Sequence, residues 1–167
     1  MKANKTHSIN GRIKTATLLF TFLFLILSNA YAFANQSQQI ITKSEKGTCE
    51  IQINGAMATK YECNGFNAPS LITSSYLYES NEYVYIFIDN PMGNACDGGP
   101  IHVISQNDDG LLKSQKTIDF CGGHYPTVIT EPKKLSIFIP SIKVEGTSKK
   151  IPGEKWVFEN NVLTKVR

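Results

Sequence analysis

After residue 34 the chain alternates between short hydrophobic runs and clusters of glycine, asparagine, aspartate and proline. The clearest run is EYVYIFI (82–88), in which both sets of alternating positions are apolar or aromatic. Successive side chains of a strand point to opposite faces, so this run predicts a strand at the centre of a sheet or between two layers. No long segment of the sequence has apolar residues at helical spacing. The pattern predicts an antiparallel all-β fold.

Turn residues divide other runs into candidate hairpins, because asparagine and glycine tolerate the positive φ angles of tight turns. The predicted hairpins are 49–53 with 59–63 around Asn54-Gly55, 100–105 with 113–120 around 106–110, and 155–159 with 162–166 around Asn160-Asn161. Segment 134–142 predicts another strand, with Pro140 at its edge or end. Segment 68–80 predicts a short turn or a further strand, and 34–47 a loose or edge-strand lead-in. Together these elements predict a single antiparallel β-sandwich or barrel-like domain.

The first 34 residues have the order of a secretory signal peptide. A basic start without acidic residues precedes the apolar run ATLLFTFLFLIL (16–27), and small residues follow at Ala30, Ala32 and Ala34. The apolar run is shorter than the ~20 residues that a membrane-spanning helix needs, and an uncleaved anchor is the alternative. We therefore expect a signal peptide over 1–34, with cleavage before Phe33 or Asn35. The exported domain, 35–167, would be periplasmic or secreted, with no membrane span after cleavage.

The four cysteines of the exported part, Cys49, Cys63, Cys96 and Cys121, are an even number, which predicts disulfides in an oxidising compartment. Cys49 and Cys63 are symmetric about residue 56, within the predicted turn NGAM (54–57), and the other two are symmetric about the 106–110 turn. Opposite residues of an antiparallel ladder have a constant sum of residue numbers. The spacing therefore predicts two cross-strand bridges, Cys49–Cys63 and Cys96–Cys121, provided that no bulge intervenes.

A zinc site is the alternative use of the same region. Cys96, His102, Cys121 and His124 carry the donor atoms that zinc prefers. An oxidising compartment favours disulfide formation by the two thiols instead. We therefore predict no metal and no cofactor.

Catalytic motifs are also missing from the sequence. It has no nucleophile elbow, no CxxC pair and no phosphate-binding glycine loop. A thiol protease built from Cys121 and His124 would need a free thiolate, which the predicted bridge removes. Asp97 and Asp119 could form an acid pair as in glycosidases, but their spacing gives this no specific support. We predict no catalytic residues.

The formal net charge of +3 originates in the signal peptide, which carries four of the seventeen basic residues and none of the fourteen acidic ones. The exported part has thirteen basic and fourteen acidic residues, a net charge of −1, and so gives no argument for binding nucleic acid. Residues 35–112 carry a net −6 and residues 113–167 a net +5. This split either steers a charged partner or is balanced within one fold.

Two groups of residues are candidate binding surfaces. Tyr83 and Tyr85 lie in a segment that also holds Tyr76 and Tyr78. Tyrosine is a large, amphipathic contact residue, but it is also a common strand residue that covers a core. Lys149 and Lys150 belong to a basic, glycine-containing loop over 144–156. That loop could enter an acidic cleft of another protein or be a solvated turn.

These observations predict an exported, non-catalytic binding protein whose partner is another exported protein. The most specific form of this hypothesis is a periplasmic inhibitor or immunity-type protein that neutralises an enzyme or toxin. The alternatives are a surface or carbohydrate-binding module that uses the tyrosine strand, and a small hydrolase with an unrecognised site. The sequence leaves the oligomeric state open.

Overall fold

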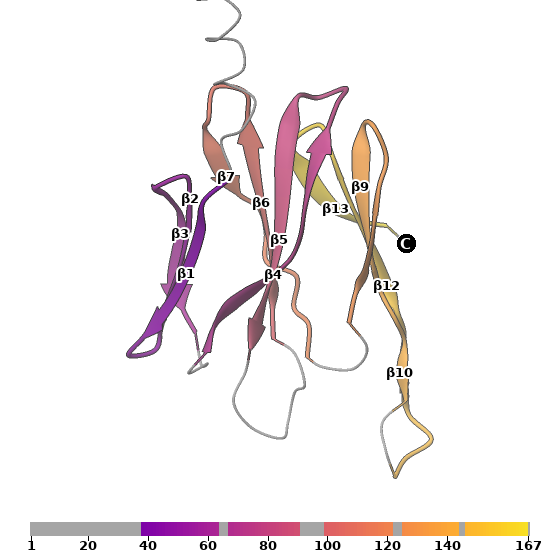
Figure 1. Cartoon of the computed structure of the whole chain (residues 1–167). Helices are drawn as coiled ribbons and strands as arrows, with labels where there is room; N and C mark the ends of the chain where they lie inside the picture. The colour runs from indigo at the N-terminus through magenta and orange to yellow at the C-terminus, as the bar shows by residue number, and fades with distance from the viewer. Residues whose placement is uncertain (1–37, 64–66, 91–98, 122–124, 144–145, 167) are drawn as a thin grey trace, which may run out of the picture. The chain divides into compact units, whose positions relative to one another are not determined.

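All regular elements in the described part of the chain are β-strands, and every pairing between them is antiparallel. The computed structural model describes residues 38–63, 67–90, 99–121, 125–143 and 146–166 (Figure 1). The chain divides into two compact units, Met1–Gln38 and Gln39–Arg167, and all strands belong to the second. The predicted antiparallel all-β fold is confirmed. The predicted signal peptide, 1–34, lies outside the described residues.

Two tight turns produce the first sheet. Its strands, in spatial order, are β1 (Ile40–Glu45), β2 (Thr48–Ile53) and β3 (Ala56–Glu62). Both turns consist of two residues with positive φ: 50° at Lys46 and 78° at Gly47, then 53° at Asn54 and 79° at Gly55. Such pairs match the right-handed twist of hairpin strands. The predicted Asn54-Gly55 hairpin is confirmed, and the lead-in contains the edge strand β1.

The second sheet holds the longest strands. Its strands, in spatial order, are β4 (Asn67–Leu77), β5 (Glu82–Asn90), β6 (Ile101–Asn107) and β7 (Leu112–Ser114). Segment 68–80, for which the sequence predicted either a short turn or a further strand, is mostly strand β4. The strand predicted over 113–120 is much shorter than expected. Gln115 N–H donates to the Val103 carbonyl at 2.9 Å, and Ile118 pairs with Ile101 as an isolated bridge, so an offset in register interrupts the ladder after β7.

The C-terminal part of the chain forms the third sheet. Its strands, in spatial order, are β13 (Val162–Val166), β12 (Glu154–Glu159), β9 (Lys134–Ile139) and β8 (Thr127–Thr130). The predicted Asn160-Asn161 hairpin joins β12 to β13, with φ of 52° and 58°. Pro140 follows the last residue of β9, as predicted. A separate ribbon of two short strands, β10 (Ile142–Lys143) and β11 (Lys150–Ile151), lies between β9 and β12 in the chain.

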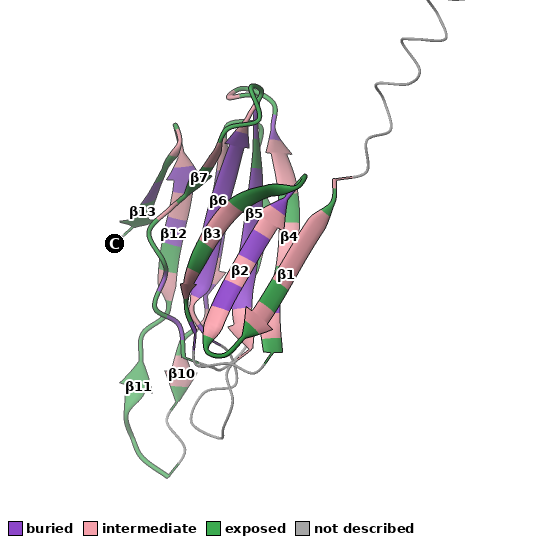
Figure 2. Ribbon diagram, turned by 90° about the vertical axis from the view of Figure 1, so that its left-hand side faces the viewer, coloured by how far each residue is buried: buried purple, intermediate pink, exposed green. Residues whose placement is uncertain are grey.

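The second sheet has a hydrophobic core on each of its faces. On one face it contacts the third sheet, and alternate residues of β5 enter this core. On the other face Tyr85 and Phe87 of β5 pack against Ile51 and Ile53 of the first sheet. The prediction that 82–88 is a strand with two apolar faces is therefore confirmed, and Figure 2 shows β5 and β6 as the most buried strands. Each fully buried isoleucine or phenylalanine stabilises the fold by about 1.5–3 kcal/mol.

The Cys49–Cys63 disulfide is confirmed, although its geometric basis differs from the prediction. The two-residue turn pairs Ile53 with Ala56, and after a register shift between Ile51 and Gln52 the ladder places Tyr61 opposite Cys49. Cys63 lies just beyond β3, where its N–H donates to the Gly47 carbonyl at 2.8 Å, and the two Cα atoms are 5.7 Å apart. The bridge therefore joins diagonal neighbours.

The predicted second bridge depends on Cys96, which lies outside the described residues. Among the described cysteines none is a free thiol. The linear strand orders show that no sheet in the described residues closes on itself. The same part of the chain has no helix that is long and apolar enough to span a membrane.

Candidate binding surface

Three tyrosines come together at the end of the second sheet where the chain turns from β4 to β5. Tyr76 on β4 lies directly opposite Tyr83 on β5, so both side chains share one face of the sheet. Their ring centroids are 4.7 Å apart. Tyr78, just after β4, packs its ring edge-on against Tyr76 at a centroid distance of 5.1 Å. We call Tyr76, Tyr78 and Tyr83 the tyrosine surface.

Exposure separates this surface from the neighbouring core. Tyr78 is 74% exposed and Tyr83 is 40% exposed, whereas Tyr85 is completely buried. Tyr85 belongs to the core beneath the first sheet, and its hydroxyl donates to Gln106 Oε1 at 3.0 Å. Tyr85, one of our candidate binding residues, is therefore a core residue, and only Tyr83 of that pair is available to a ligand.

Polar and acidic groups lie beside the tyrosine surface. The Tyr76 hydroxyl donates to Asn81 Oδ1 in the β4–β5 turn at 3.2 Å. Desolvation and then the negative charge of Asp108, in the β6–β7 turn, raise the pKa of the Tyr76 phenol. Asp108, Asp109 and Glu79 are exposed, and none of them forms an ion pair with another described residue. The rings are therefore bordered by negative charge.

The second candidate surface, the basic loop, is partly ordered as the β10–β11 ribbon. Lys150 pairs with Lys143 across the ribbon, and both side chains are exposed, as is Lys149. The Lys149 N–H donates to Thr147 Oγ1 at 3.2 Å. Figure 1 shows β10 at the end of the unit opposite to the β4–β5 turn. The structure therefore does not bring Lys149 and Lys150 together with Tyr83.

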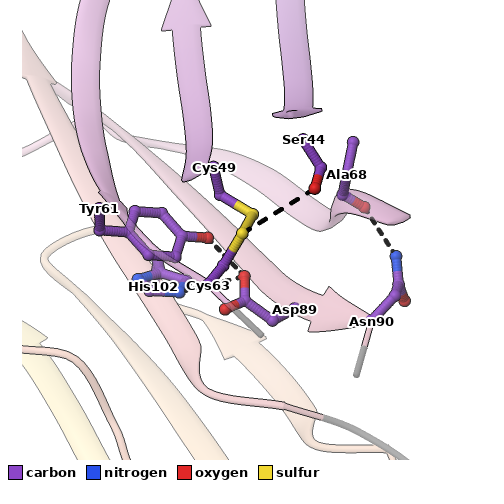
Figure 3. The surroundings of a disulfide bond; sticks show 8 residues. All are labelled: Ser44, Cys49, Tyr61, Cys63, Ala68, Asp89, Asn90 and His102. Carbon is purple, nitrogen blue, oxygen red and sulfur yellow. Dashed lines mark hydrogen bonds and ion pairs between the residues drawn. A yellow bond between two sulfur atoms is a disulfide. The ribbon is translucent and has the colours of Figure 1, made fainter. Parts of the chain in front are cut away.

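A buried polar cluster, which the sequence did not predict, lies beneath the first sheet beside the Cys49–Cys63 bridge (Figure 3). The Tyr61 hydroxyl donates to Asp89 Oδ1. His102 Nε2 is 3.2 Å from the same oxygen, and the side chains of His102 and Asp89 are only 7% and 13% exposed. The rings of Tyr61 and His102 are in contact at an interplanar angle of 33°, with centroids 4.2 Å apart.

The chemistry of this cluster is better suited to stability than to catalysis. Burial, then the hydrogen bond to Asp89 and its charge, strongly raise the pKa of the Tyr61 phenol, so Tyr61 stays protonated at neutral pH and is a very weak acid. His102 Nε2 is close to Asp89 but makes no well-aligned hydrogen bond in the described structure. The hydrogen bond from Tyr61 to Asp89 links β3 to β5, and His102 on β6 lies against both side chains.

The structure does not bring together the residues that we considered as metal ligands or as an acid pair. Cys96, Asp97 and His124 are outside the described residues. His102 is in the buried cluster, and Asp119 is exposed. No group of three or more His, Cys, Asp or Glu residues that could hold a metal occurs in the part of the chain that the structure describes.

The outer face of the first sheet has a hollow of about 310 Å³ with charged walls. Lys43, Glu50 and Lys60 lie side by side across its three strands. Lys60 Nζ is 2.6 Å from Glu50 Oε1, so charges of opposite sign are already paired there. This arrangement is typical of a solvated sheet face.

No known protein family, curated protein or solved structure is detectably similar to this chain. The function must therefore be argued from the surfaces themselves. Of these, the tyrosine surface combines rigid, exposed aromatic area with unpaired charge.

Proposed function

We propose that this protein is an exported, non-catalytic binding protein that recognises another exported protein through the tyrosine surface. In its most specific form it is a periplasmic inhibitor or immunity-type protein that neutralises an enzyme or toxin. The Cys49–Cys63 disulfide is consistent with an exported protein. The two hydrophobic cores support a β-sandwich arrangement of the three sheets, which would hold the surface rigidly.

The observation that carries the proposal is the exposure of Tyr78 and Tyr83 in a cluster whose rings already restrain one another. Tyrosine is enriched among the residues that dominate binding energy at protein interfaces. Rings held by neighbours lose little conformational entropy when a partner binds. Tyr76 and Tyr83 sit on paired strands rather than on a loop, which improves the precision of the surface.

The test begins with the mature protein immobilised and exposed to the exported proteins of its own cells. The dissociation constant of a captured partner is then measured by titration calorimetry for the wild type and for Tyr78→Ala combined with Tyr83→Ala. Loss of two interface tyrosines is expected to weaken binding by about 30-fold or more. Tyr125→Ala is the matched control, because Tyr125 is 65% exposed and does not contact the tyrosine surface. Equal affinity of the double variant and the wild type would refute this assignment.

A carbohydrate-binding module is the second candidate, favoured by the 74% exposure of the Tyr78 ring. Exposed aromatic faces provide an apolar contact that a sugar ring can cover. A glycan array probed with the same variants separates the two functions. Glycan binding that disappears with Tyr78→Ala and Tyr83→Ala, together with no captured protein, would replace the protein-binding proposal by this one.

A further inference from the structure

We infer that the partner presents lysine or arginine side chains to the tyrosine surface, so that its contact region is cationic. This inference rests on the proposed function and specifies the chemistry of the partner. Its basis is the negative border of the tyrosine surface and the affinity of aromatic faces for cations. It differs from the expectation that Lys149 and Lys150 bind an acidic partner, because it uses the opposite end of the molecule.

The negative border results from the distribution of charge along the chain. Residues 61–112 contain seven acidic residues and no lysine or arginine. This segment supplies β4, β5 and β6, together with the β4–β5 and β6–β7 turns. Three exposed carboxylates belong to the turns at this end: Glu79 directly follows Tyr78, Asp108 acts on the Tyr76 phenol, and Asp109 follows Asp108 in the chain.

The lysines of the adjoining β8–β9 turn and of β7 already have other partners. The β4–β5 turn adjoins the β8–β9 turn, where the Glu79 N–H donates to the Pro132 carbonyl at 3.0 Å. Lys133 and Lys134, next to Pro132, pair with Glu159 at 3.2 Å and Glu131 at 3.4 Å. Lys113, on β7, donates to the Asn161 carbonyl at 2.8 Å. The described residues therefore leave the acidic border without a compensating cation.

Tyrosine rings and carboxylates together favour a cation over other ligands. The face of an aromatic ring carries negative electrostatic potential and attracts ammonium and guanidinium groups. Adjacent carboxylates strengthen that attraction and repel anionic partners. Arginine also has a planar group that stacks on a tyrosine ring while donating to a carboxylate.

The first experiment uses a fluorescent hexa-arginine peptide as the probe and hexa-glutamate as its anionic counterpart, measured by fluorescence anisotropy. Hexa-arginine is expected to bind the mature protein in about 20 mM salt and to bind more weakly in about 150 mM salt, because exposed charges are screened. Tyr78→Leu with Tyr83→Leu should weaken binding about tenfold, whereas Tyr78→Phe with Tyr83→Phe should retain it. Preserved binding in the leucine variant would overturn the inference, because leucine keeps the apolar area and removes the aromatic face.

Charge variants test the acidic border separately. Asp108→Asn with Asp109→Asn should weaken hexa-arginine binding about threefold or more. Asp119→Asn, which changes an exposed carboxylate away from the tyrosine surface, should leave it unchanged. Tighter binding of hexa-glutamate at the tyrosine surface, or equal effects of Asp119→Asn and the double variant, would overturn the inference.

The captured partner distinguishes failure of this inference from failure of the proposed function. If partner binding depends on Tyr78 and Tyr83 but not on salt or on Asp108 and Asp109, the function stands and the cationic contact is wrong. If partner binding ignores the tyrosines, both are wrong. If the protein self-associates and Lys150→Glu abolishes this self-association, the occupant of the tyrosine surface would be the β10–β11 ribbon of a second copy. The inference of a separate partner protein would then be overturned.

Discussion

Asp89 is the central residue of the buried polar cluster, because one of its carboxylate oxygens contacts both Tyr61 and His102 beneath the first sheet. Gly99 makes this position possible: a Cβ atom there would lie 2.7 Å from the Cβ of Asp89. The Asp89 carbonyl accepts the Gly99 N–H at 2.9 Å. A buried carboxylate needs such partners, since leaving one unpaired costs several kcal/mol.

Replacing Tyr61 with phenylalanine tests this cluster. The variant keeps the ring that contacts His102 but removes the hydroxyl donor to Asp89, and at pH 7 we expect a loss of about 1–2 kcal/mol in the free energy of unfolding. Urea denaturation followed by circular dichroism measures it. Tyr125→Phe, on an exposed ring, is the control and should change stability by less than about 0.5 kcal/mol.

The same variant should respond differently to alkaline pH. The pKa of Tyr61 is raised in the folded state above its ordinary value of 10.0, so the unfolded chain loses this proton first as the pH rises. The stabilising effect of the protonated phenol is therefore complete below pH 10 and is lost above it. Between about pH 10 and 12 the wild type should lose about 1 kcal/mol more stability than Tyr61→Phe, allowing for partial exposure of the phenol. Parallel stability curves would contradict this.

The alternation of side chains in 82–88 correctly indicated which residues of β5 share a face, but not how much of that face is covered. Tyr83 and Tyr85 point the same way, yet one is 40% exposed and the other is buried. The difference arises because Ile51 and Ile53 of the first sheet cover Tyr85 and Phe87. Coverage by a separate sheet is a long-range property that no local pattern contains.

Hairpins were predictable where asparagine occupies a turn position with positive φ. Asn54-Gly55 and Asn160-Asn161 both form the expected turns. The Lys46-Gly47 turn was not predicted, because lysine rarely adopts a positive φ. A glycine that follows a lysine therefore does not by itself indicate a two-residue turn with positive φ at both positions. The correct Cys49–Cys63 pair followed from an incorrect register, because the two-residue Asn54-Gly55 turn pairs Ile53 with Ala56 and the ladder then places Tyr61 rather than Cys63 opposite Cys49.

Asn161 joins the second and third sheets as well as forming a turn. Its Oδ1 accepts hydrogen bonds from Ser105 Oγ at 3.0 Å and Gln115 Nε2 at 3.1 Å. Asn161→Gly keeps the positive φ without strain but removes both bonds, so we expect a loss of about 1–2 kcal/mol. Asn160→Gly is the matched control, because Asn160 has a similar φ of 52°.

Thermal or urea unfolding of the two glycine variants measures the contribution of the Asn161 side chain directly. A small change for Asn160→Gly and a larger loss for Asn161→Gly would show that the two sheets are held together at this turn. Equal losses would mean that only the backbone conformation of the turn matters.

A group of exposed carboxylates and a group of exposed lysines lie at opposite ends of the Gln39–Arg167 unit, apart from the charges that form local ion pairs. The acidic border lies at the β4–β5 end, and the β10–β11 ribbon with Lys143, Lys149 and Lys150 lies at the other. The sequence indicated the split between residues 35–112 and 113–167. Which charges face the tyrosines could not be derived from it, because that depends on which turns meet at one end of the second sheet.

Export and the complete disulfide set belong to the whole chain, and one experiment on the exported protein tests both. A basic start, a short apolar run and small residues at Ala30, Ala32 and Ala34 predict cleavage before Phe33 or Asn35. Intact mass and N-terminal sequencing should identify one of these ends in the secreted or periplasmic fraction. An uncleaved Met1 in the membrane fraction would contradict the prediction.

Non-reducing peptide mapping of the same material should link Cys49 to Cys63 and Cys96 to Cys121, with no free thiol. The first link is present in the structure. The second would connect the loop after β5 to the segment after β7, and a closed loop of that length stabilises a chain by about 3 kcal/mol in the chain-entropy model. Reduction should therefore lower the free energy of unfolding more than replacement of Cys49 and Cys63 by alanine does, because it opens both loops. Equal losses would mean that Cys49–Cys63 is the only bridge that stabilises the fold.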